Sequence, residues 1–275
     1  MKGLMRLLLV LVVLTNLSFG QDINYGSNQG KYIKISNTKI YYEEYGSGMP
    51  LLLLHGGFGS IHDFQEVIPE FAKHYRVIAI DSPGHGKSEL PDSLSFDLMV
   101  DVCSQLIDAF KLDSLNVMGY SDGGITALLL AAKRPEKVRK IIATGVNSHM
   151  DAIKPEVLET LRMISPEFME TYQKEWIADY NSKSSSKDQW KKYINSMREM
   201  YFSDEVVIPS QVFSDIKARV LLVFGDNDVV KLEHGIELYQ SINGSELCVL
   251  PDTPHEIFKS SPKLMSEIGL EFLQK

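Results

Sequence analysis

The stretch LNVMGYSDGGITALLLAAK, residues 115–133, places a serine among glycines at the point where an apolar run changes its period. The residues before Ser121 form a short continuous apolar run, typical of a buried strand, and those after it follow the period of a helix. Glycine inside a helix costs roughly 1 kcal/mol relative to alanine, so Gly123 and Gly124 indicate a backbone constraint. We predict a sharp strand-to-helix turn that holds Ser121 in a strained conformation with its hydroxyl exposed.

Five residues of this stretch, Gly119-Tyr120-Ser121-Asp122-Gly123, fit the pattern G-x-S-x-G. Side chains two positions before and two positions after the serine would crowd such a turn, which explains the glycine at both. A serine hydroxyl is a weak nucleophile at neutral pH and needs a neighbouring base, itself oriented by an acid. Ser121 is therefore the candidate nucleophile, and its base and acid are expected further along the chain.

Three histidines follow Ser121, namely His149, His234 and His255. His255 lies in LPDTPHEIF, a loop after the last predicted strand in which the prolines and Asp252 indicate a turn. It is the candidate base. His149 begins a helical segment and His234 lies within a predicted helix, so we expect both to be structural or exposed.

Two aspartates, Asp226 and Asp228, come directly after the buried run VLLVF. A carboxylate in this place can accept the imidazole proton and fix the tautomer of the base. Between Asp228 and His255 there is room for one helix and one strand, which makes Asp228 the candidate acid. Asp226 is the alternative acid, and turn capping is the role we expect for it.

Acyl transfer also needs hydrogen-bond donors for the oxyanion. One candidate is the backbone N–H of Asp122, the residue after the nucleophile. The other is expected from the glycine-rich loop HGGFGS at 55–60, where Gly57 or Phe58 would supply an N–H and the glycines let the backbone approach. His55 in this loop is expected to be structural.

The rest of the chain alternates short apolar runs with helical patterns. Such runs suit strands buried on both faces, and their alternation with longer helices predicts an α/β fold with a mostly parallel, doubly wound sheet. Residues 31–45 alternate apolar and polar side chains across a turn at Ser36-Asn37, which predicts an antiparallel hairpin at the N-terminal edge. The predicted strands lie near 50–57, 75–81, 115–121, 139–145, 219–226 and 245–252, and the predicted helices near 62–73, 96–111, 124–133, 233–241 and 261–274.

Residues 147–212 interrupt this alternation, because they contain several helical stretches and no convincing strand. Ligands in such folds bind beyond the carboxyl ends of the strands. We therefore interpret the segment as a helical cap, or lid, inserted into a core formed by 21–146 and 213–275. A purely structural insertion is the alternative.

The first twenty residues, MKGLMRLLLVLVVLTNLSFG, combine a basic start, an apolar stretch and a small-x-small end. This pattern predicts a secretory signal peptide over 1–20. An uncleaved anchor is the alternative, although Thr15 and Asn16 interrupt the run short of the roughly 20 apolar residues that span a bilayer. We expect an exported protein, periplasmic or secreted, with no stable membrane insertion after cleavage. Cys103 and Cys248 are expected to be buried free thiols, with a disulfide as the alternative.

Composition and charge restrict the class of partner. The chain has 275 residues, of which 44% are hydrophobic and 23% charged, as in a globular protein with a substantial core. The net charge of -8 and the lack of a Lys/Arg stripe argue against nucleic acid. No cysteine or histidine spacing supports zinc. We expect a small-molecule substrate, no metal and no organic cofactor, and no pattern predicts an oligomeric state.

These motifs resemble, in content and order, those of the α/β-hydrolase fold superfamily over about 31–275, with 147–212 in the place of the family's cap. They are His55–Gly59, Asp81–Ser88, Gly119–Gly123, Gly225–Asp228 and His255. The resemblance implies that the acid is the last aspartate of G-x-x-D, Asp228, and that DSPGHGKS is a structural turn in which His85 is not catalytic. Residues 119–147 are also similar to the valacyclovir hydrolases (biphenyl hydrolase-like proteins), serine hydrolases of amino-acid esters, which implies that Asp122 binds an α-amino group.

Together these features predict a serine hydrolase of small carboxylic esters or amides, including α-amino-acid esters, with a triad of Ser121, His255 and Asp228. C–C bond hydrolases and cofactor-free perhydrolases use the same triad and are the alternative enzymes. A serine nucleophile argues against a haloalkane dehalogenase, whose nucleophile is an aspartate, and the lack of an unusually apolar lid stretch argues against a lipase. A non-catalytic ligand-binding protein with the same fold is the alternative of another class.

Overall fold

An eight-stranded sheet forms the centre of the molecule in a computed structural model that describes residues 30–35, 37–185, 188–202 and 208–275. The strand order is β1-β2-β4-β3-β5-β6-β7-β8. β2 pairs antiparallel with β1 and β4, and all other neighbours are parallel, which confirms the predicted sheet and its hairpin edge. The strands are β1 (Lys31–Ile35), β2 (Thr38–Tyr45), β3 (Pro50–Leu54), β4 (Arg76–Ile80), β5 (Leu115–Tyr120), β6 (Val138–Thr144), β7 (Arg219–Asn227) and β8 (Glu246–Pro254).

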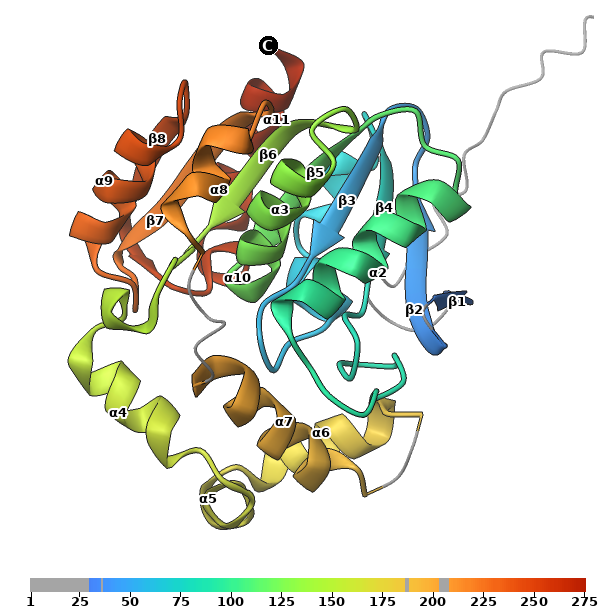
Figure 1. Cartoon of the computed structure of the whole chain (residues 1–275), viewed down its shortest axis with the longest axis vertical. Helices are drawn as coiled ribbons and strands as arrows, with labels where there is room; N and C mark the ends of the chain where they lie inside the picture. Colours follow the sequence, from blue (N-terminus) through green and yellow to red (C-terminus); the bar gives the residue numbers. More distant parts are fainter. Residues whose placement is uncertain (1–29, 36, 186–187, 203–207) are drawn as a thin grey trace, which may run out of the picture.

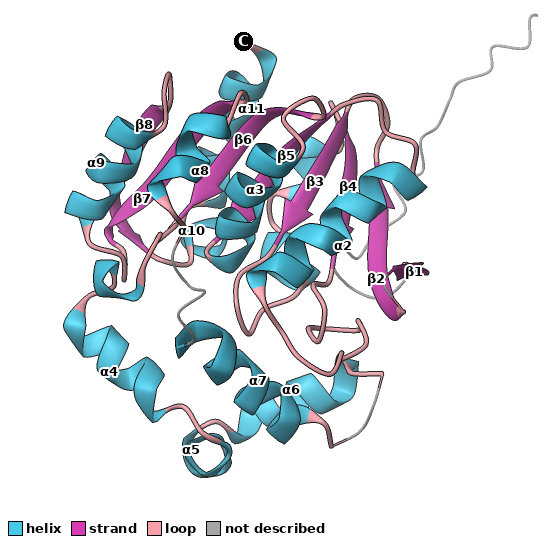
Figure 2. Cartoon of the chain, viewed as in Figure 1, coloured by secondary structure: helices cyan, strands magenta, loops and turns pink. Residues whose placement is uncertain are grey.

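Helices cover both faces of this sheet (Figure 2), and successive strand side chains alternate between the two faces. In β3, Leu52 and Leu54 join the core under one face, whereas Leu51 and Leu53 join the core under the other. This is why the run reads as continuously apolar. The first core includes side chains of α2 (Phe96–Ala109), α3 (Asp122–Lys133), α8 (Ser210–Asp215) and α9 (Leu232–Ser241), and the second includes side chains of α1 (Ile68–Phe71), α10 (Ile257–Ser260) and α11 (Pro262–Gln274).

The helix predicted near 62–73 is wrong as a continuous element. The structure has a short 3-10 helix, η1 (Ile61–Phe64), and then α1, which begins at Ile68 with Pro69 in its first turn. Proline lacks an N–H and its ring clashes with the preceding turn, so a helix tolerates it only at its start. Pro69 therefore divides the segment.

The insertion between β6 and β7 consists of helices among its described residues. They are η2 (Met150–Ala152), α4 (Pro155–Met163), α5 (Pro166–Tyr172), α6 (Lys174–Lys183) and α7 (Trp190–Phe202), followed by α8. Figure 1 shows α4–α7 gathered at the end of the sheet to which β3 and β7 point, whereas α8 lies back against the sheet near α3. The insertion thus stands beyond the carboxyl ends of the strands, where ligands bind in open α/β sheets.

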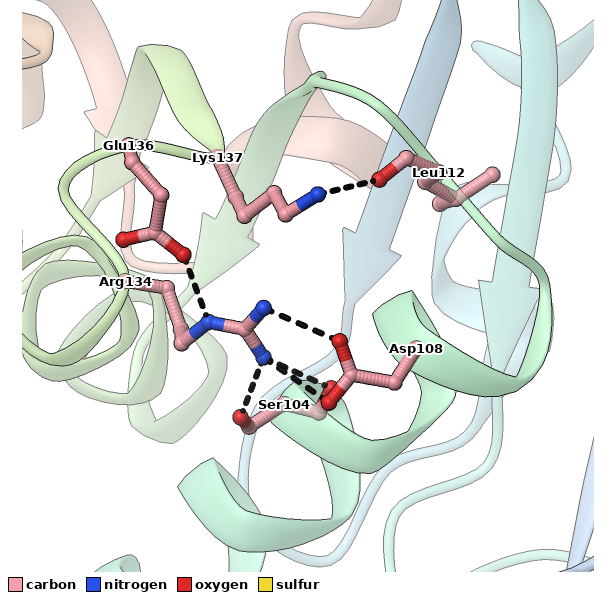
Figure 3. A network of polar contacts seen from close by, with 6 residues as sticks. All are labelled: Ser104, Asp108, Leu112, Arg134, Glu136 and Lys137. Atoms are coloured by element: carbon pink, nitrogen blue, oxygen red, sulfur yellow. Dashed lines mark hydrogen bonds and ion pairs between the residues drawn. The ribbon is translucent and has the colours of Figure 1, made fainter.

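The C-terminal end of α3 is tied to α2 by a polar network (Figure 3). Arg134, which follows α3, donates to the Asp108 carboxylate at 2.9 Å and to the Ser104 hydroxyl at 2.9 Å. The hydrogen bonds from this guanidinium hold the pKa of Asp108 below its ordinary value. Lys137 Nζ donates to the Leu112 carbonyl at 3.0 Å. These contacts fix the helix that begins directly after Ser121.

Both cysteines are free thiols, as predicted, but only Cys103 is fully buried. Burial raises the pKa of the Cys103 thiol to about 12, so it stays protonated. Cys248 on β8 is half-buried. Among the residues that the structure describes, no helix combines the length and apolar character needed to cross a membrane. The predicted signal peptide and Ser36 of the hairpin turn lie outside those residues.

Candidate active site

The turn between β5 and α3 presents Ser121 in a strained conformation, with φ 52° and ψ −118°. Left-handed backbone is uncommon for residues other than glycine and persists where the surroundings impose it. Here the Ser121 N–H donates to the Thr144 carbonyl at 2.8 Å. A Cβ at Gly123 would lie 1.9 Å from the Leu54 carbonyl oxygen, and one at Gly119 would lie 2.2 Å from the Gly123 oxygen. The turn therefore requires glycine at both positions.

Three side chains from the ends of β5, β7 and β8 meet in a line of hydrogen bonds. His255 Nε2 lies 3.1 Å from Ser121 Oγ, and His255 Nδ1 lies 2.6 Å from Asp228 Oδ1. Asp228 is buried, and the same Oδ1 also accepts the Val230 N–H at 3.0 Å. A carboxylate accepts only from a protonated Nδ1, so the Nε2 lone pair is directed at the serine. This arrangement can deprotonate the hydroxyl.

Asp226, the alternative acid, faces a different group. Its Oδ1 accepts the Thr253 N–H at 3.1 Å. Backbone N–H groups of Asp252 and Thr253 hold the pKa of this exposed carboxyl below its ordinary value. Asp226 thus holds the turn that leads to His255 and does not contact its ring.

The histidine of the glycine-rich loop is used structurally. His55 is buried, its Nε2 accepts the Ser82 N–H at 3.0 Å, and its Nδ1 lies 2.7 Å from the Gly56 carbonyl oxygen. Both ring nitrogens are therefore occupied by backbone groups. His85, in the neighbouring turn, is buried with its Nδ1 2.9 Å from the Pro83 oxygen, and burial lowers its pKa to about 3.

One group of three potential metal ligands occurs among the described residues: His149, His234 and Glu237. The Nε2 of His234 accepts the Ser148 N–H at 3.0 Å, so its proton resides on Nδ1, which lies 3.0 Å from Glu237 Oε2. Burial lowers the pKa of His234 and keeps the ring neutral. Neither ring nitrogen offers a lone pair to a cation. The group therefore fits a hydrogen-bonded link between α9 and the start of the insertion.

The glycine-rich loop after β3 contains the two candidates for the second oxyanion donor, the N–H groups of Gly57 and Phe58. The Gly59 N–H bonds to the Gly56 carbonyl at 3.2 Å and closes a turn in which Phe58 has φ 60°. The Phe58 N–H donates to the Tyr193 hydroxyl of α7 at 3.2 Å, so it is already used. The occupied N–H of Phe58 favours Gly57 as the second oxyanion donor, and this assignment stays a prediction.

Asp122, the residue after the serine, carries a buried carboxylate. Its side chain accepts the Tyr201 hydroxyl at 2.7 Å, and the structure records no ion pair to it from the described residues. Burial raises the pKa of Asp122 to about 6, although the Tyr201 hydrogen bond acts in the opposite direction. Burial also raises the pKa of Tyr201, which keeps the donating proton on the phenol. A Cβ at Gly57 would lie 1.9 Å from the Tyr201 hydroxyl and 2.6 Å from Asp122 Oδ2, so this contact needs glycine.

A cavity of about 280 Å³ opens beside these groups. Ser121, Asp122, His255 and the exposed carboxylate Glu256 lie on its wall, and its described lining residues include no lysine or arginine. Apolar side chains from the core and from α4 complete it: Phe96, Ile125, Ile153, Val157 and Leu161. The volume suits a small molecule, and the charge of the wall suits a neutral or cationic one.

Sequence reasoning missed the residues that the insertion adds to this site. Tyr201 approaches Asp122, and Tyr193 and Trp176 approach Phe58. The available signal was the recurrence of large aromatic side chains in helices that otherwise read as polar, which indicates a buried face. It does not indicate which loop of the core that face contacts.

Comparisons with known proteins bear on the fold and on the class of protein. Residues 49–175 match the family model described as the alpha/beta hydrolase fold. The chain is 25% identical over 252 residues to the serine hydrolase BPHL of Homo sapiens, covering 88% of this chain and 85% of that one. It is 28% identical over 284 residues to a 2-hydroxy-6-oxo-6-phenylhexa-2,4-dienoate hydrolase of Comamonas testosteroni, covering 90% and 97%. The solved structure of the enzyme of that name from Rhodococcus sp. strain RHA1 has the same fold, with a TM-score of 0.75, 21% identity and coverage of 90% and 98%.

Proposed function

The chain belongs to the α/β-hydrolase superfamily, and from this premise we propose that it is a serine hydrolase that cleaves small carboxylic esters or amides at Ser121. The observation that carries the proposal is the hydrogen-bonded series from Ser121 Oγ through His255 to Asp228, on the wall of a cavity of substrate size. Both heavy-atom distances lie within reach for proton transfer.

In the proposed reaction, Ser121 Oγ attacks the carbonyl carbon while His255 Nε2 takes the hydroxyl proton. Asp228 stabilises the imidazolium and holds its tautomer. The backbone N–H groups of Gly57 and Asp122 donate hydrogen bonds to the negatively charged oxygen of the tetrahedral intermediate. His255 then protonates the leaving alcohol or amine, and a water molecule releases the acid from the serine by the same steps in reverse order.

The finer proposal concerns charge: the preferred substrates carry an amino group near the scissile carbonyl. Asp122 combines burial, a position next to the nucleophile and no ion pair from the described residues. Glu256 adds a second carboxylate to the same cavity. A bound ammonium would pair with Asp122 in a place that water reaches poorly, where the attraction is strongest.

C–C bond hydrolysis is the second candidate, because a relative that spans 90% of this chain carries the name of a dienoate hydrolase. A dienoate is an anion. The described residues of the cavity wall include two carboxylates and no lysine or arginine, so the wall has the same sign of charge as this anion. Electrostatic attraction therefore favours the ester of an amine.

Labelling with a fluorophosphonate tests the nucleophile. We expect the wild-type protein to be labelled at Ser121 and the Ser121→Ala variant to remain unlabelled. Absence of labelling, together with absence of ester hydrolysis, would refute the hydrolase and favour the ligand-binding alternative.

A pair of esters tests the substrate class. L-Valine ethyl ester and ethyl isovalerate differ only in the α-amino group, and we expect kcat/KM to favour the first by at least about tenfold, since hydrogen bonds to charged groups contribute roughly 1.5–3 kcal/mol. The preference should disappear in Asp122→Asn, which keeps the backbone N–H. Turnover of 2-hydroxy-6-oxo-6-phenylhexa-2,4-dienoate at a higher kcat/KM than either ester would instead establish the second candidate.

Export is also part of the proposal, and it rests on the composition of residues 1–20 alone. The expected product is a periplasmic or secreted enzyme whose N-terminus begins near Gln21. N-terminal sequencing of the protein from the producing cell tests this, and a protein that retains Met1 in the cytoplasmic fraction would refute it.

A further inference from the structure

Phe58 occupies a backbone conformation that its own chemistry disfavours. It is the third residue of the turn closed by Gly59 and Gly56, and its φ is 60°. Turns with positive φ at this position normally carry glycine or asparagine there, because a Cβ is strained. A strained residue persists only where surrounding contacts hold it in place.

The contacts that hold Phe58 come from the insertion. Its N–H donates to the Tyr193 hydroxyl at 3.2 Å, and its carbonyl accepts from Trp176 Nε1 at 3.2 Å. Its ring meets the rings of Trp176, Tyr193 and Tyr201 edge-on at centroid distances of 6.0, 5.9 and 6.0 Å. The two polar backbone groups of Phe58 and its side chain therefore all bind α6 or α7.

These anchors are themselves fixed. The side chain of Tyr193 is fully buried and belongs to the core that runs under α2 and α3. Its ring stacks on Trp176 at 5.7 Å and lies 5.0 Å from Tyr180. A displacement of α6 and α7 would therefore displace Phe58 as well.

We infer that Tyr193 and Trp176 are positioning residues for the oxyanion site: they hold Phe58, and through it the N–H of Gly57, toward Ser121. The inference rests on the proposed function. It makes α6 and α7 part of the catalytic apparatus and not only a cover, because the glycine-rich loop keeps its strained turn only while these helices are seated. Gly57 itself is in contact with the Tyr201 hydroxyl on the same helix, α7.

Two matched tyrosine variants test this. Tyr193→Phe keeps the ring and removes the acceptor of the Phe58 N–H. Tyr180→Phe removes a hydroxyl of the same aromatic cluster, which donates to the Gly84 carbonyl and not to the glycine-rich loop. Trp176→Phe removes the donor to the Phe58 carbonyl and serves as an independent second variant. The measurements are kcat and KM on L-valine ethyl ester, per active site titrated with fluorophosphonate, and the inhibition constant of phenylboronic acid.

Removing an oxyanion donor outright lowers kcat by about 10²–10³, so loosening one should lower it by about tenfold in Tyr193→Phe, with KM within about twofold. Phenylboronic acid bonds Ser121 Oγ through a boron that becomes tetrahedral, and its affinity should fall by a similar factor. Tyr180→Phe should match the wild type in both. Equal kcat per titrated site in Tyr193→Phe and Tyr180→Phe would overturn the inference while leaving the hydrolase intact. A wild-type protein that neither labels nor hydrolyses esters would overturn the proposed function and the inference with it.

Discussion

The buried carboxylate of Asp122 should lower the stability of the free protein at neutral pH, and Asp122→Asn should therefore stabilise it. Burial raises the pKa of Asp122 from its ordinary value of 3.8 to about 6. As pH rises past 3.8, the unfolded chain loses this proton first, and the native state binds more protons than the unfolded state until the pH exceeds 6. The free energy of unfolding consequently falls with pH across this window.

The size of the effect follows from the shift. About two pKa units at 1.36 kcal/mol each correspond to about 3 kcal/mol lost between pH 4 and pH 8. Asp122 is only 7% exposed, so solvent screening removes little of this effect. Asparagine keeps an oxygen that accepts the Tyr201 hydroxyl and carries no charge at any pH.

Urea unfolding of the wild type and Asp122→Asn at pH 4 and pH 8 measures this difference. We expect the variant to be more stable by about 2–3 kcal/mol at pH 8 and nearly equal at pH 4. Asp226→Asn is the matched control: its exposed carboxyl has a lowered pKa, so any stability it contributes is present above the unfolded value and lost on acidification. An Asp122→Asn variant less stable than the wild type at pH 8, or stabilised equally at both pH values, would show that ionised Asp122 does not destabilise the native state.

Asp228→Asn should lower kcat for ester hydrolysis by about 10⁴-fold, because the imidazole loses its tautomer control, whereas Asp226→Asn should leave kcat within about twofold; equal losses would contradict the assignment of the acid. Gly123→Ala places a Cβ 1.9 Å from the Leu54 carbonyl oxygen, and thermal denaturation should show a loss of about 4 kcal/mol or more. A soluble Gly123→Ala variant with an unchanged Tm would contradict the geometry of the turn. Arg134→Met removes the bidentate link to α2, so Tm should fall by about 2–4 °C while kcat/KM stays unchanged. A parallel loss of kcat would indicate that the contacts of Arg134 with α2 also affect the active site.

The sequence predicted the sheet well because its strands are buried on both faces. The side chains of Leu51 to Leu54 alternate between two cores, so every position of the run is apolar. The first and last residues of the apolar run can therefore be read from the sequence. The helix near 62–73 failed for a local reason, since a proline that can only start a helix lies in its middle. Helical periodicity alone does not register that constraint.

In the candidate site, too, the sequence located the residues that are placed by local patterns and missed those that are placed by long-range packing. Ser121 could be located because its turn is made by adjacent residues, and Asp228 and His255 because turns after buried strands place their side chains at one edge of the sheet. The contact between Phe58 and Tyr193 joins residues 135 positions apart. It depends on how the insertion folds back over the core, and no short pattern encodes that packing.

In the proposed enzyme, Asp122 would connect the stability of the fold to the choice of substrate. A buried carboxylate without an ion pair from the described residues is unfavourable in the free protein, and an ammonium bound beside it would supply the missing charge. The same free energy that ionised Asp122 removes from folding is then available to discriminate an amino ester from its neutral analogue, and only above pH 6, where the carboxylate is ionised. Stability and selectivity should therefore depend on pH in opposite directions through one group. That coupling distinguishes a recognition role for Asp122 from a structural one, because a carboxylate that merely holds Tyr201 would change stability without changing the preference between the two esters.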